Sequence, residues 1–459
     1  MSASERKSDL DVRKALEDLS AEGVQFVQIE TPDINGTLRG KLTRVDKALS
    51  ESGSAFCTII YGMSRVDDIS EGPLSSFDNG FPDAFAVADP STVRLIDPAR
   101  KVAAVICDMY DAERNDHYPH SPRGVLHQVV DRSRALGYEA RFAVELELCV
   151  LHADDPLIRA ERHYDQTAAL GRTHNAYSLI RMSDLREIAV DFMAEMDRID
   201  IPLDAIHTEL GGGMLEVAIS HLPALQAADA CARVKLYMKE FLAKRGLAAV
   251  FMPKWRHEES GCGGHVHQSL WKDGEPAFAT KDGNISETAR QYIAGQLASL
   301  NDFAAIFYPT INAYRRMDAS TWAPENVSWG VDNRTCALRM IARPGPKAYR
   351  IEHRCPGADI NSYLAIAAML AGGIHGIEER LDPPVAIEGN AADMDLNSLP
   401  TTLSEATERL AHSRLARDLL GHDLIEQFVI MQRNECSRWH SWQRNQVSPW
   451  EVTRYFDAL

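Results

Sequence analysis

Three short stretches of the chain alternate polar and apolar side chains with the two-residue period of a β-strand. In the clearest stretch, residues 141–150, Glu145 and Glu147 share one face, and valines and leucines fill the other. Residues 265–269 and residues 350–354 repeat the pattern with histidines, arginines and a further glutamate. A buried carboxylate on a strand is costly unless it is paired or bound to a metal ion. We therefore expect three strands that converge on a polar, cation-filled cavity, as in an enzyme site.

The first 115 residues predict a small domain built around a sheet. The turn residues Asn35 and Gly36 lie between two apolar runs, which is typical of a hairpin. The expected elements are a helix at 9–22, hairpin strands at 24–29 and 37–42, and strands at 93–96 and 102–106.

Residues 116–459 predict one large α+β domain. Ser121 and Pro122 are typical of the first residues of a helix, as N-cap and N1. Further helices are expected at 183–199, 225–245 and 286–305, and strands at 141–150, 205–209, 264–271, 335–342 and 348–354. The apolar segment 363–377 contains two glycines and is too short to span a bilayer, so it predicts a buried helix.

Composition narrows the possible functions. The formal net charge is −17 and no block of basic residues is present, so nucleic acid is not an expected partner. The eight cysteines are scattered without a Cys-x-x-Cys pair, which is typical of reduced cytosolic thiols. The first residues lack the apolar stretch of a signal peptide. We therefore expect a cytoplasmic protein that does not associate with a membrane.

The carboxylates of the polar stretches are joined by Glu209 and Glu216, which flank a glycine-rich turn. Hard cations such as Mg²⁺ and Mn²⁺ prefer carboxylate oxygens, with an occasional imidazole for Mn²⁺. Five glutamates and His265 would suffice for two such ions. Each glutamate taken singly is equally compatible with the protein surface. The strand alternation argues against that alternative for Glu145 and Glu147.

Glycines and arginines supply the other half of a possible site. The loop at 258–264 is rich in glycine, which allows backbone amides to approach a ligand closely. Six cationic residues gather in the last third of the chain: Arg316, Arg334, Arg339, Lys347, Arg350 and Arg354. Metal ions beside arginines are what phosphoryl transfer requires. A surface salt-bridge network is the alternative for one or two of the six.

Four segments carry a family resemblance. The first two are Gly-Cys-Gly-Gly-His-Val-His-Gln-Ser-Leu at 261–270 and the segment 333–339, which begins with Asn-Arg and ends with Arg. The other two are Pro-Lys-Ala-Tyr-Arg-Ile-Glu-His-Arg at 346–354 and Pro-Gly-Ala-Asp-Ile-Asn-Ser-Tyr-Leu at 356–364. With these segments the chain resembles the type I glutamine synthetase superfamily over essentially its whole length. The resemblance implies an α+β fold: a small β-grasp-like domain at 1–115, and a catalytic domain at 116–459 with a curved antiparallel sheet surrounded by helices.

The resemblance also implies roles for single residues in binding two or three Mg²⁺ or Mn²⁺ ions and L-glutamate. One ion would be held by Glu147, Glu209 and Glu216, and the second by Glu145, His265 and Glu352. Glutamate would contact Glu147, Gly261, Arg316 and Arg354.

A second set of roles concerns ATP, the implied co-substrate. Arg334 and Arg339 would contact the phosphates, and Glu352 and Trp322 would complete the catalytic set. The nucleotide site would include Asp204, His267, Ser269, Lys347 and Arg350. The family reaction phosphorylates the γ-carboxylate of glutamate, and a nitrogen nucleophile then displaces the phosphate.

The chain departs from ammonia-using members at two places. Residues 54–64 lack the Asp-Gly-Ser-Ser motif, and Trp322 precedes the Ala323-Pro324 pair where those members carry a glutamate nearby. An ammonium pocket needs negative charge to offset desolvation, whereas an indole offers a cation–π contact of about 0.5–2 kcal/mol. Trp322 therefore favours an organic amine: an alkylamine, arylamine, ethanolamine or polyamine. Packing of Trp322, or a displaced carboxylate at Asp318 or Glu325, remains an alternative.

The leading hypothesis is an ATP-dependent glutamate–amine ligase of the γ-glutamyl-amide branch. The alternatives are a true glutamine synthetase, a non-catalytic structural or regulatory relative, and an enzyme that phosphorylates a guanidine. The resemblance further implies a homo-oligomer, a dodecamer of two stacked hexamers. The identity of the amine is left open.

Overall fold

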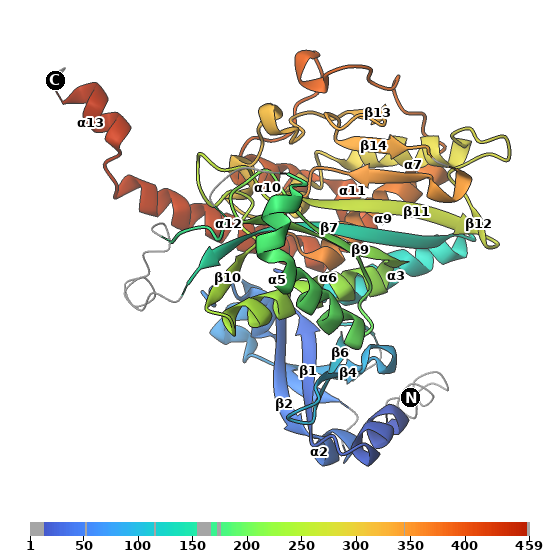
Figure 1. Cartoon of the computed structure of the whole chain (residues 1–459), viewed down its shortest axis with the longest axis vertical. Coiled ribbons are helices and arrows are strands. Elements are labelled where there is room, and N and C mark those ends of the chain that lie inside the picture. Colours follow the sequence, from blue (N-terminus) through green and yellow to red (C-terminus); the bar gives the residue numbers. More distant parts are fainter. Residues whose placement is uncertain are drawn as a thin grey trace.

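The computed structural model describes residues 13–50, 53–113, 116–153, 167–171, 176–343 and 345–456. Within these residues the chain folds around two β-sheets, and the sheet from the N-terminal residues lies below the larger one (Figure 1). Residues 13–21 are helical, as predicted, while residues 9–12 of the predicted helix lie outside the described part.

The first sheet contains six strands in the order β2-β1-β6-β4-β3, with β5 paired to β6. The strands are β1 (Phe26–Pro32), β2 (Leu38–Arg44), β3 (Ser54–Cys57), β4 (Asp83–Ala88), β5 (Arg94–Asp97) and β6 (Val102–Tyr110). A short helix, α2 (Val45–Ser50), follows β2. Strands β1 and β2 form the predicted antiparallel hairpin, and β1 pairs parallel with β6. The sequence did not predict β3 and β4.

The second sheet contains nine strands in the order β13-β14-β15-β11-β7-β9-β8, with β10 paired to β7 and β12 to β11. One half of this sheet contains β11 (Gly264–Lys272), β7 (Glu139–His152), β9 (Met214–Pro223) and the edge strand β8 (Leu203–Thr208). The others are β10 (Leu247–Val250), β12 (Glu275–Pro276), β13 (Trp329–Val331), β14 (Leu338–Ile341) and β15 (Arg350–His353). All pairs are antiparallel except β13 with β14.

One face of the second sheet forms the core with a layer of helices. Val144, Leu146 and Leu148 of β7 are fully buried. Helix α3 (Pro122–Ala135), which begins after the predicted N-cap Ser121, packs on β7 together with α6 (Ala224–Ala243). Because apolar residues alternate along the strand, the opposite face of β7 is left for polar side chains.

The predicted buried helix is α9 (Ser362–Glu378), and it packs against α3, α6 and α7 (Glu287–Ser299). Its glycines have a packing role. A Cβ atom on Gly295 of α7 would collide with the Gly372 carbonyl oxygen and the Gly376 backbone, so the two helices approach more closely than side chains would allow.

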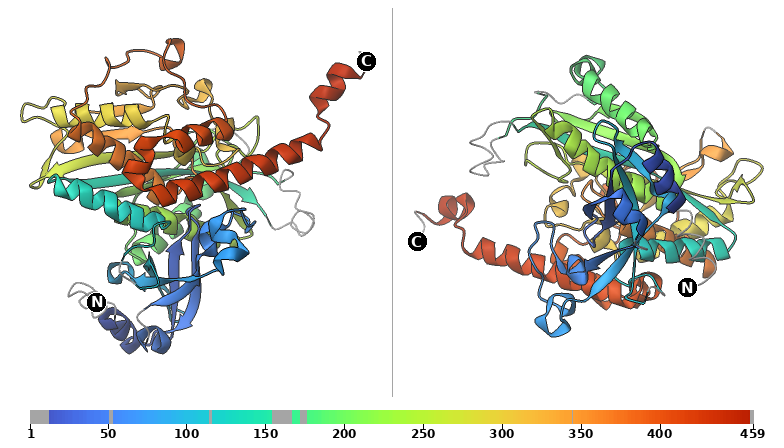
Figure 2. Two further views of the ribbon diagram at one scale, coloured as in Figure 1. Left: turned by 180° about the vertical axis from the view of Figure 1, so that it is seen from behind. Right: turned by 90° about the horizontal axis from the view of Figure 1, so that it is seen from below.

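The remaining helices are α5 (Leu179–Arg198), α8 (Ala304–Phe307), α10 (Leu403–His412), α11 (Arg414–Leu420), α12 (His422–Arg444) and α13 (Pro449–Tyr455). Helix α12 crosses the molecule and α13 projects away from it (Figures 1 and 2). None of the described helices combines the length and the apolarity needed to cross a bilayer.

A buried ion cluster joins the first sheet to the helices of the second. Arg123 of α3 is fully buried, and its guanidinium donates hydrogen bonds to three carboxylates. These are Asp108 of β6 at 2.6 Å, Asp89 after β4 at 2.7 Å, and Asp229 of α6 at 2.9 and 3.0 Å. The domain boundary near residue 115 stays a prediction, but the cluster ties both of its sides together.

We expect Arg123→Met to lower the free energy of unfolding by about 3–5 kcal/mol, because it leaves three carboxylates without their shared cation. Denaturant unfolding followed by circular dichroism measures the change. Arg134→Met, at the exposed end of the same helix, is the matched control. A variant with the same unfolding midpoint as the wild type would contradict the role given to Arg123.

Candidate active site

The three predicted polar stretches form adjacent strands of the second sheet, β7, β11 and β15. Their chemical groups are direct cross-strand neighbours: His265 lies opposite Glu145, and His267 lies opposite Glu352. On the flanking strands Glu216 lies opposite Glu147, and Arg339 lies opposite Glu352. Since opposite residues in a sheet point to the same face, these side chains converge over the polar face.

Glu145, His267 and Glu352 form the first group of potential metal ligands, with ligand atoms within 4.8 Å of one another. His267 Nε2 lies 2.9 Å from Glu145 Oε1. His265 Nδ1 lies 3.6 Å from a carboxylate oxygen of both glutamates. Burial raises the pKa of Glu145, but the charge of His267 and hydrogen bonds from both histidines outweigh it and hold that pKa well below its usual range.

Two arginines donate hydrogen bonds to the Glu352 carboxylate. Arg354 Nη1 donates to Glu352 Oε1 at 2.6 Å, and Arg339 Nη1 donates to Oε2 at 3.0 Å. Burial raises the pKa of Glu352, but the charges of Arg354 and His265 overcome it and bring the pKa down to about 2. Glu352 is therefore an ionised, fixed carboxylate at neutral pH.

His207, Glu209 and Glu216 form the second group of potential metal ligands. His207 Nε2 lies 3.0 Å from Glu216 Oε1, and its Nδ1 lies 3.6 Å from Glu209 Oε1. The hydrogen bond with Glu216 raises the pKa of His207 to about 9. The Tyr177 ring lies against the imidazole, with ring centroids 4.6 Å apart.

The sequence reasoning missed His207 and Tyr177 as site residues. His207-Thr208-Glu209 repeats the alternation of the three polar stretches, so the same pattern would have placed His207 beside Glu209. For Tyr177 the chain offers no comparable pattern.

Glu147 lies next to Glu216 but belongs to neither close group. Its Oε2 accepts a hydrogen bond from the Gly263 backbone N–H at 2.6 Å. Burial raises the pKa of Glu147 to about 8, and nearby Glu216 and Glu209 add to the effect although Arg316 opposes it. A cation bound beside Glu147, Glu209 and Glu216 would offset the repulsion among these carboxylates. Their oxygens therefore fit a cation-binding site.

The glycine-rich loop at 258–264 packs against Arg316. A Cβ atom on Gly261 would lie 2.7 Å from Arg316 Cγ, so only glycine fits without a shift. Arg316 Nη2 lies 3.1 Å from His265 Nε2, and Nη1 donates to the Cys355 carbonyl oxygen at 3.0 Å. The loop, Arg316 and the first ligand group therefore form one continuous surface.

Three further predicted site residues, Arg350, Ser269 and Asp204, belong to neither ligand group. Arg350 Nε donates to His267 Nδ1 at 3.2 Å, and Ser269 accepts from the Trp271 indole at 3.1 Å. Asp204 is exposed on β8 and accepts a hydrogen bond from Ser220.

Three more predicted residues lie in exposed loops: Arg334, Lys347 and Trp322. The Arg334 carbonyl accepts from Arg354 Nε at 2.9 Å, which anchors its turn beside the site. The Trp322 indole is half exposed and has no hydrogen bond or ring contact among the residues that the structure describes.

Two groups of carboxylates and imidazoles, flanked by arginines, fit hard divalent cations. Residues 119–455 match the family model described as "Glutamine synthetase, catalytic domain". The chain belongs to the glutamine synthetase family. The family predicted from the sequence is therefore confirmed, and with it an α+β fold built on a glutamine synthetase catalytic domain.

Several relatives of this glutamine synthetase family member match almost end to end. "Glutamate--isopropylamine ligase" of Pseudomonas sp is 33% identical over 100% of both chains. "Type-1 glutamine synthetase 2" of Dictyostelium discoideum is 34% identical, over 95% of this chain and 84% of that protein. "Gamma-glutamylethanolamide synthetase GlnA4" of Streptomyces coelicolor is 32% identical, over 96% of this chain and 94% of that protein.

A solved structure titled "GmaS/ADP complex-Conformation 1" superimposes with a TM-score of 0.82 and 23% identity, over 96% of this chain and 99% of the other. At this coverage the likeness extends through the N-terminal sheet, and it supports the α+β fold of the whole chain.

We expect Mn²⁺ to stabilise the metal-free protein by about 2–3 kcal/mol at a concentration near 100 times its dissociation constant. Thermal unfolding with and without the ion measures the effect. Glu145→Gln and Glu216→Gln, one from each ligand group, are each expected to lose about half of it. Glu258→Gln, an exposed carboxylate nearby, is the control. The same Mn²⁺ effect in all four proteins would contradict the assignment of the two groups.

Proposed function

We propose that the protein is an ATP-dependent ligase that joins the γ-carboxylate of L-glutamate to an organic amine through γ-glutamyl phosphate. The observation that carries the proposal is the pair of carboxylate–histidine groups flanked by arginines on one face of the second sheet. Phosphoryl transfer needs such an arrangement, because cations must offset the charge that spreads over the phosphate oxygens. A solely structural protein has no need for so many partly buried charges on one face.

The two ligand groups would each hold a divalent cation, Mg²⁺ or Mn²⁺, which when bound would neutralise phosphate oxygens. Glu145 and Glu352, with His265 Nδ1 3.6 Å from an oxygen of each, would hold one ion, and Glu209 and Glu216 would hold the other, with Glu147 beside them. The close approach of His267 to Glu145 and Glu352, and of His207 to Glu209 and Glu216, adds an imidazole to each group.

Arginines would bind the anionic parts of the substrates. Arg339, fixed on β14 between Glu352 and Asp332, would contact a transferred phosphate, together with Arg334 of the turn before β14. Arg316 and Arg354 lie beside the glycine-rich loop, where they would hold the α-carboxylate of glutamate. The nucleotide would lie along His267, Ser269 and Arg350, with Asp204 and Lys347 at its exposed end.

Trp322 supports an organic amine over ammonia. Its backbone has a φ of +59°, which is strained for a bulky residue and is typical of functional positions. The Asp318 carbonyl oxygen accepts from the backbone N–H of Thr321 and of Ala323, so the loop holds this conformation from both sides. The Asp318 carboxylate accepts from Ser320 within the same turn, which argues against its use as a displaced ammonium ligand.

A true glutamine synthetase is the second candidate, because one relative of that name is about as similar as the amine ligases. Glu209 and the aromatic Tyr177 beside His207 would offer a small cation both negative charge and a π-face. The two candidates differ in the nitrogen nucleophile alone.

We also propose a cytoplasmic homo-oligomer, a dodecamer of two stacked hexamers, as the family resemblance implies. The exposed aromatic residues Trp450 and Tyr455 of the projecting α13, with Phe456 at its C-cap, support association, because exposed apolar surface often marks an interaction site.

With glutamate, ATP and Mg²⁺ present, we expect an organic amine to drive phosphate release with a kcat/KM at least about 10-fold above that for ammonium. A panel of ammonium, isopropylamine, ethanolamine, a polyamine, an arylamine and a guanidine covers the alternatives. Release with ammonium alone would identify a glutamine synthetase. No release with any member of the panel would overturn the catalytic proposal.

We expect Trp322→Glu to shift the preference toward ammonium by about 10-fold, because a carboxylate would offset desolvation of a small cation. The ratio of kcat/KM for ammonium to that for the preferred amine measures the shift. Trp322→Gln, which removes the indole without adding charge, is the matched control. An amine profile unchanged in both variants would remove Trp322 from the pocket.

A further inference from the structure

A second cavity lies away from the carboxylate groups, where the two sheets meet. Its volume is about 490 Å³, within the range of small-molecule sites. The walls come from the hairpin turn at 35–38, Arg65, the outer side of α6, the end of β10 with residues 251–253, and residues 358–360. None of the residues that we place in the active site lines this cavity.

Three cationic side chains line the cavity: Arg65, Lys235 and Lys239. Lys235 and Lys239 are one turn apart on α6, so they point to the same side of that helix. No carboxylate among the described residues lies within ion-pair distance of any of the three. In a chain with a formal net charge of −17, such a group of unpaired cations is unusual.

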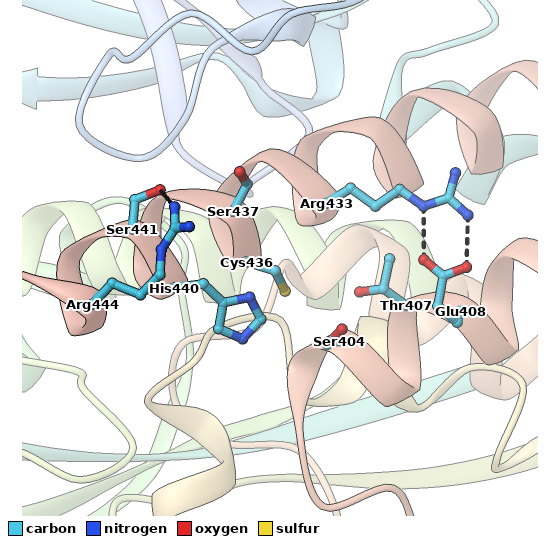
Figure 3. A pocket seen from close by; sticks show the side chains of 9 residues that line it. All are labelled: Ser404, Thr407, Glu408, Arg433, Cys436, Ser437, His440, Ser441 and Arg444. Carbon is cyan, nitrogen blue, oxygen red and sulfur yellow. Dashed lines mark hydrogen bonds and ion pairs between the residues drawn. The ribbon is translucent and has the colours of Figure 1, made fainter.

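A polar cavity between α10 and α12 shows the ordinary arrangement (Figure 3). There Arg433 faces Glu408, and the guanidinium donates two hydrogen bonds to the carboxylate, at 2.7 and 2.8 Å. Arg433 is thus neutralised by the protein itself, whereas Arg444, which also lines that cavity, donates to Ser441 Oγ at 3.4 Å. For the three cations of the cavity where the two sheets meet, no ion pair of this kind is found among the described residues.

The environment of Lys235 shows that the positive charge is not satisfied internally. Its Nζ donates to the Ile360 carbonyl oxygen at 2.7 Å, which leaves two of its three donors without a protein partner in the described chain. Burial lowers the pKa of Lys235 to about 8, and the charges of Arg65 and Lys239 add to the effect. An anion bound in the cavity would offset the burial of this charge and the repulsion from Arg65 and Lys239, and would therefore favour the protonated form of Lys235.

The carboxylate in the wall does not cancel the three cations. Asp359 Oδ2 accepts from Thr310 Oγ1 at 2.6 Å, while its Oδ1 is buried and has no hydrogen-bond partner. Burial raises the pKa of Asp359, although Arg65 and Lys235 oppose the shift. At most one negative charge therefore faces three positive ones.

The backbone just before Arg65 is anchored by residues of the β1–β2 hairpin. The Asn35 side-chain amide donates to the Met63 carbonyl oxygen at 2.8 Å, and Arg39 donates to the Ser64 carbonyl oxygen at 3.4 Å. Arg39 is itself fixed by Asp33 at 2.9 Å. The segment that carries Arg65 is thus anchored before any ligand arrives, which lowers the entropic cost of binding.

We propose that this cavity binds a small di- or trivalent anion with carboxylate or phosphate groups, held by Arg65, Lys235 and Lys239. The volume fits a molecule the size of a tricarboxylate, and the three cations match its charge. One cation of the site comes from the segment between β3 and β4, and two come from α6, which packs on the second sheet. A bound anion therefore bridges the two parts of the fold.

Citrate tests the proposal by isothermal titration on the full-length protein, with inorganic phosphate as a second arm that tells the two anion types apart. We expect the Arg65→Gln/Lys239→Gln double variant to weaken binding at least 10-fold. Both side chains are exposed, so the variant is expected to fold. Lys281→Gln, an exposed lysine outside the cavity, is the control and should leave binding unchanged. Identical titrations for the wild type and the double variant would overturn the proposal.

A second measurement locates the anion in the wild-type protein without relying on a variant. Crystals soaked in selenate are expected to show an anomalous selenium peak between Lys235, Lys239 and Arg65. Peaks confined to the arginines of the active site would overturn the proposal. So would a carboxylate from a second copy of the chain seated between these cations.

Discussion

Repulsion among carboxylates gathered on one half-buried face of a sheet is the constraint to which the rest of the molecule responds. Each close group is partly neutralised by an imidazole, and Glu352 is further clamped by Arg339 and Arg354. Glu147 carries the remaining cost, because burial, with the charges of Glu216 and Glu209 added, raises its pKa to about 8. The protein thus holds its carboxylates in fixed positions, where bound divalent cations would relieve their repulsion, and ordering of this kind is what preorganised electrostatic catalysis requires.

The polar face keeps its geometry because the opposite face is rigid. The apolar residues of β7 lie against α3 and α6, and α9 packs against both helices, so backbone shifts that would move Glu145 or Glu147 disturb the core as well. The first sheet is fixed to this core through Arg123 and its three carboxylates. Within the described chain, packing and ion pairs therefore join the active-site face, the apolar core and the N-terminal sheet to one another.

Alternation and apolar runs were enough to predict β7, β11, β15 and α9, because burial of one face leaves a clear period in the sequence. Strand β9 was missed, since it begins directly after a glycine-rich turn that hides its start. The partnership of His267 with Glu145 also escaped prediction, because it depends on cross-strand register between segments over 100 residues apart. Asp204 came from the family resemblance alone, because an exposed aspartate leaves no pattern in the sequence, whereas Lys347 was singled out as one of a group of six cationic residues.

The two-sided strands also restrict how the chain can evolve. Inserting or deleting one residue before Glu145 in β7 would rotate every later side chain to the other side, sending glutamates into the hydrocarbon interior and leucines toward the charged surface. A single insertion or deletion would therefore disrupt both the fold and the chemistry of the site. Drift along these strands is thus confined to point substitution, and changes in length are left to the connecting loops.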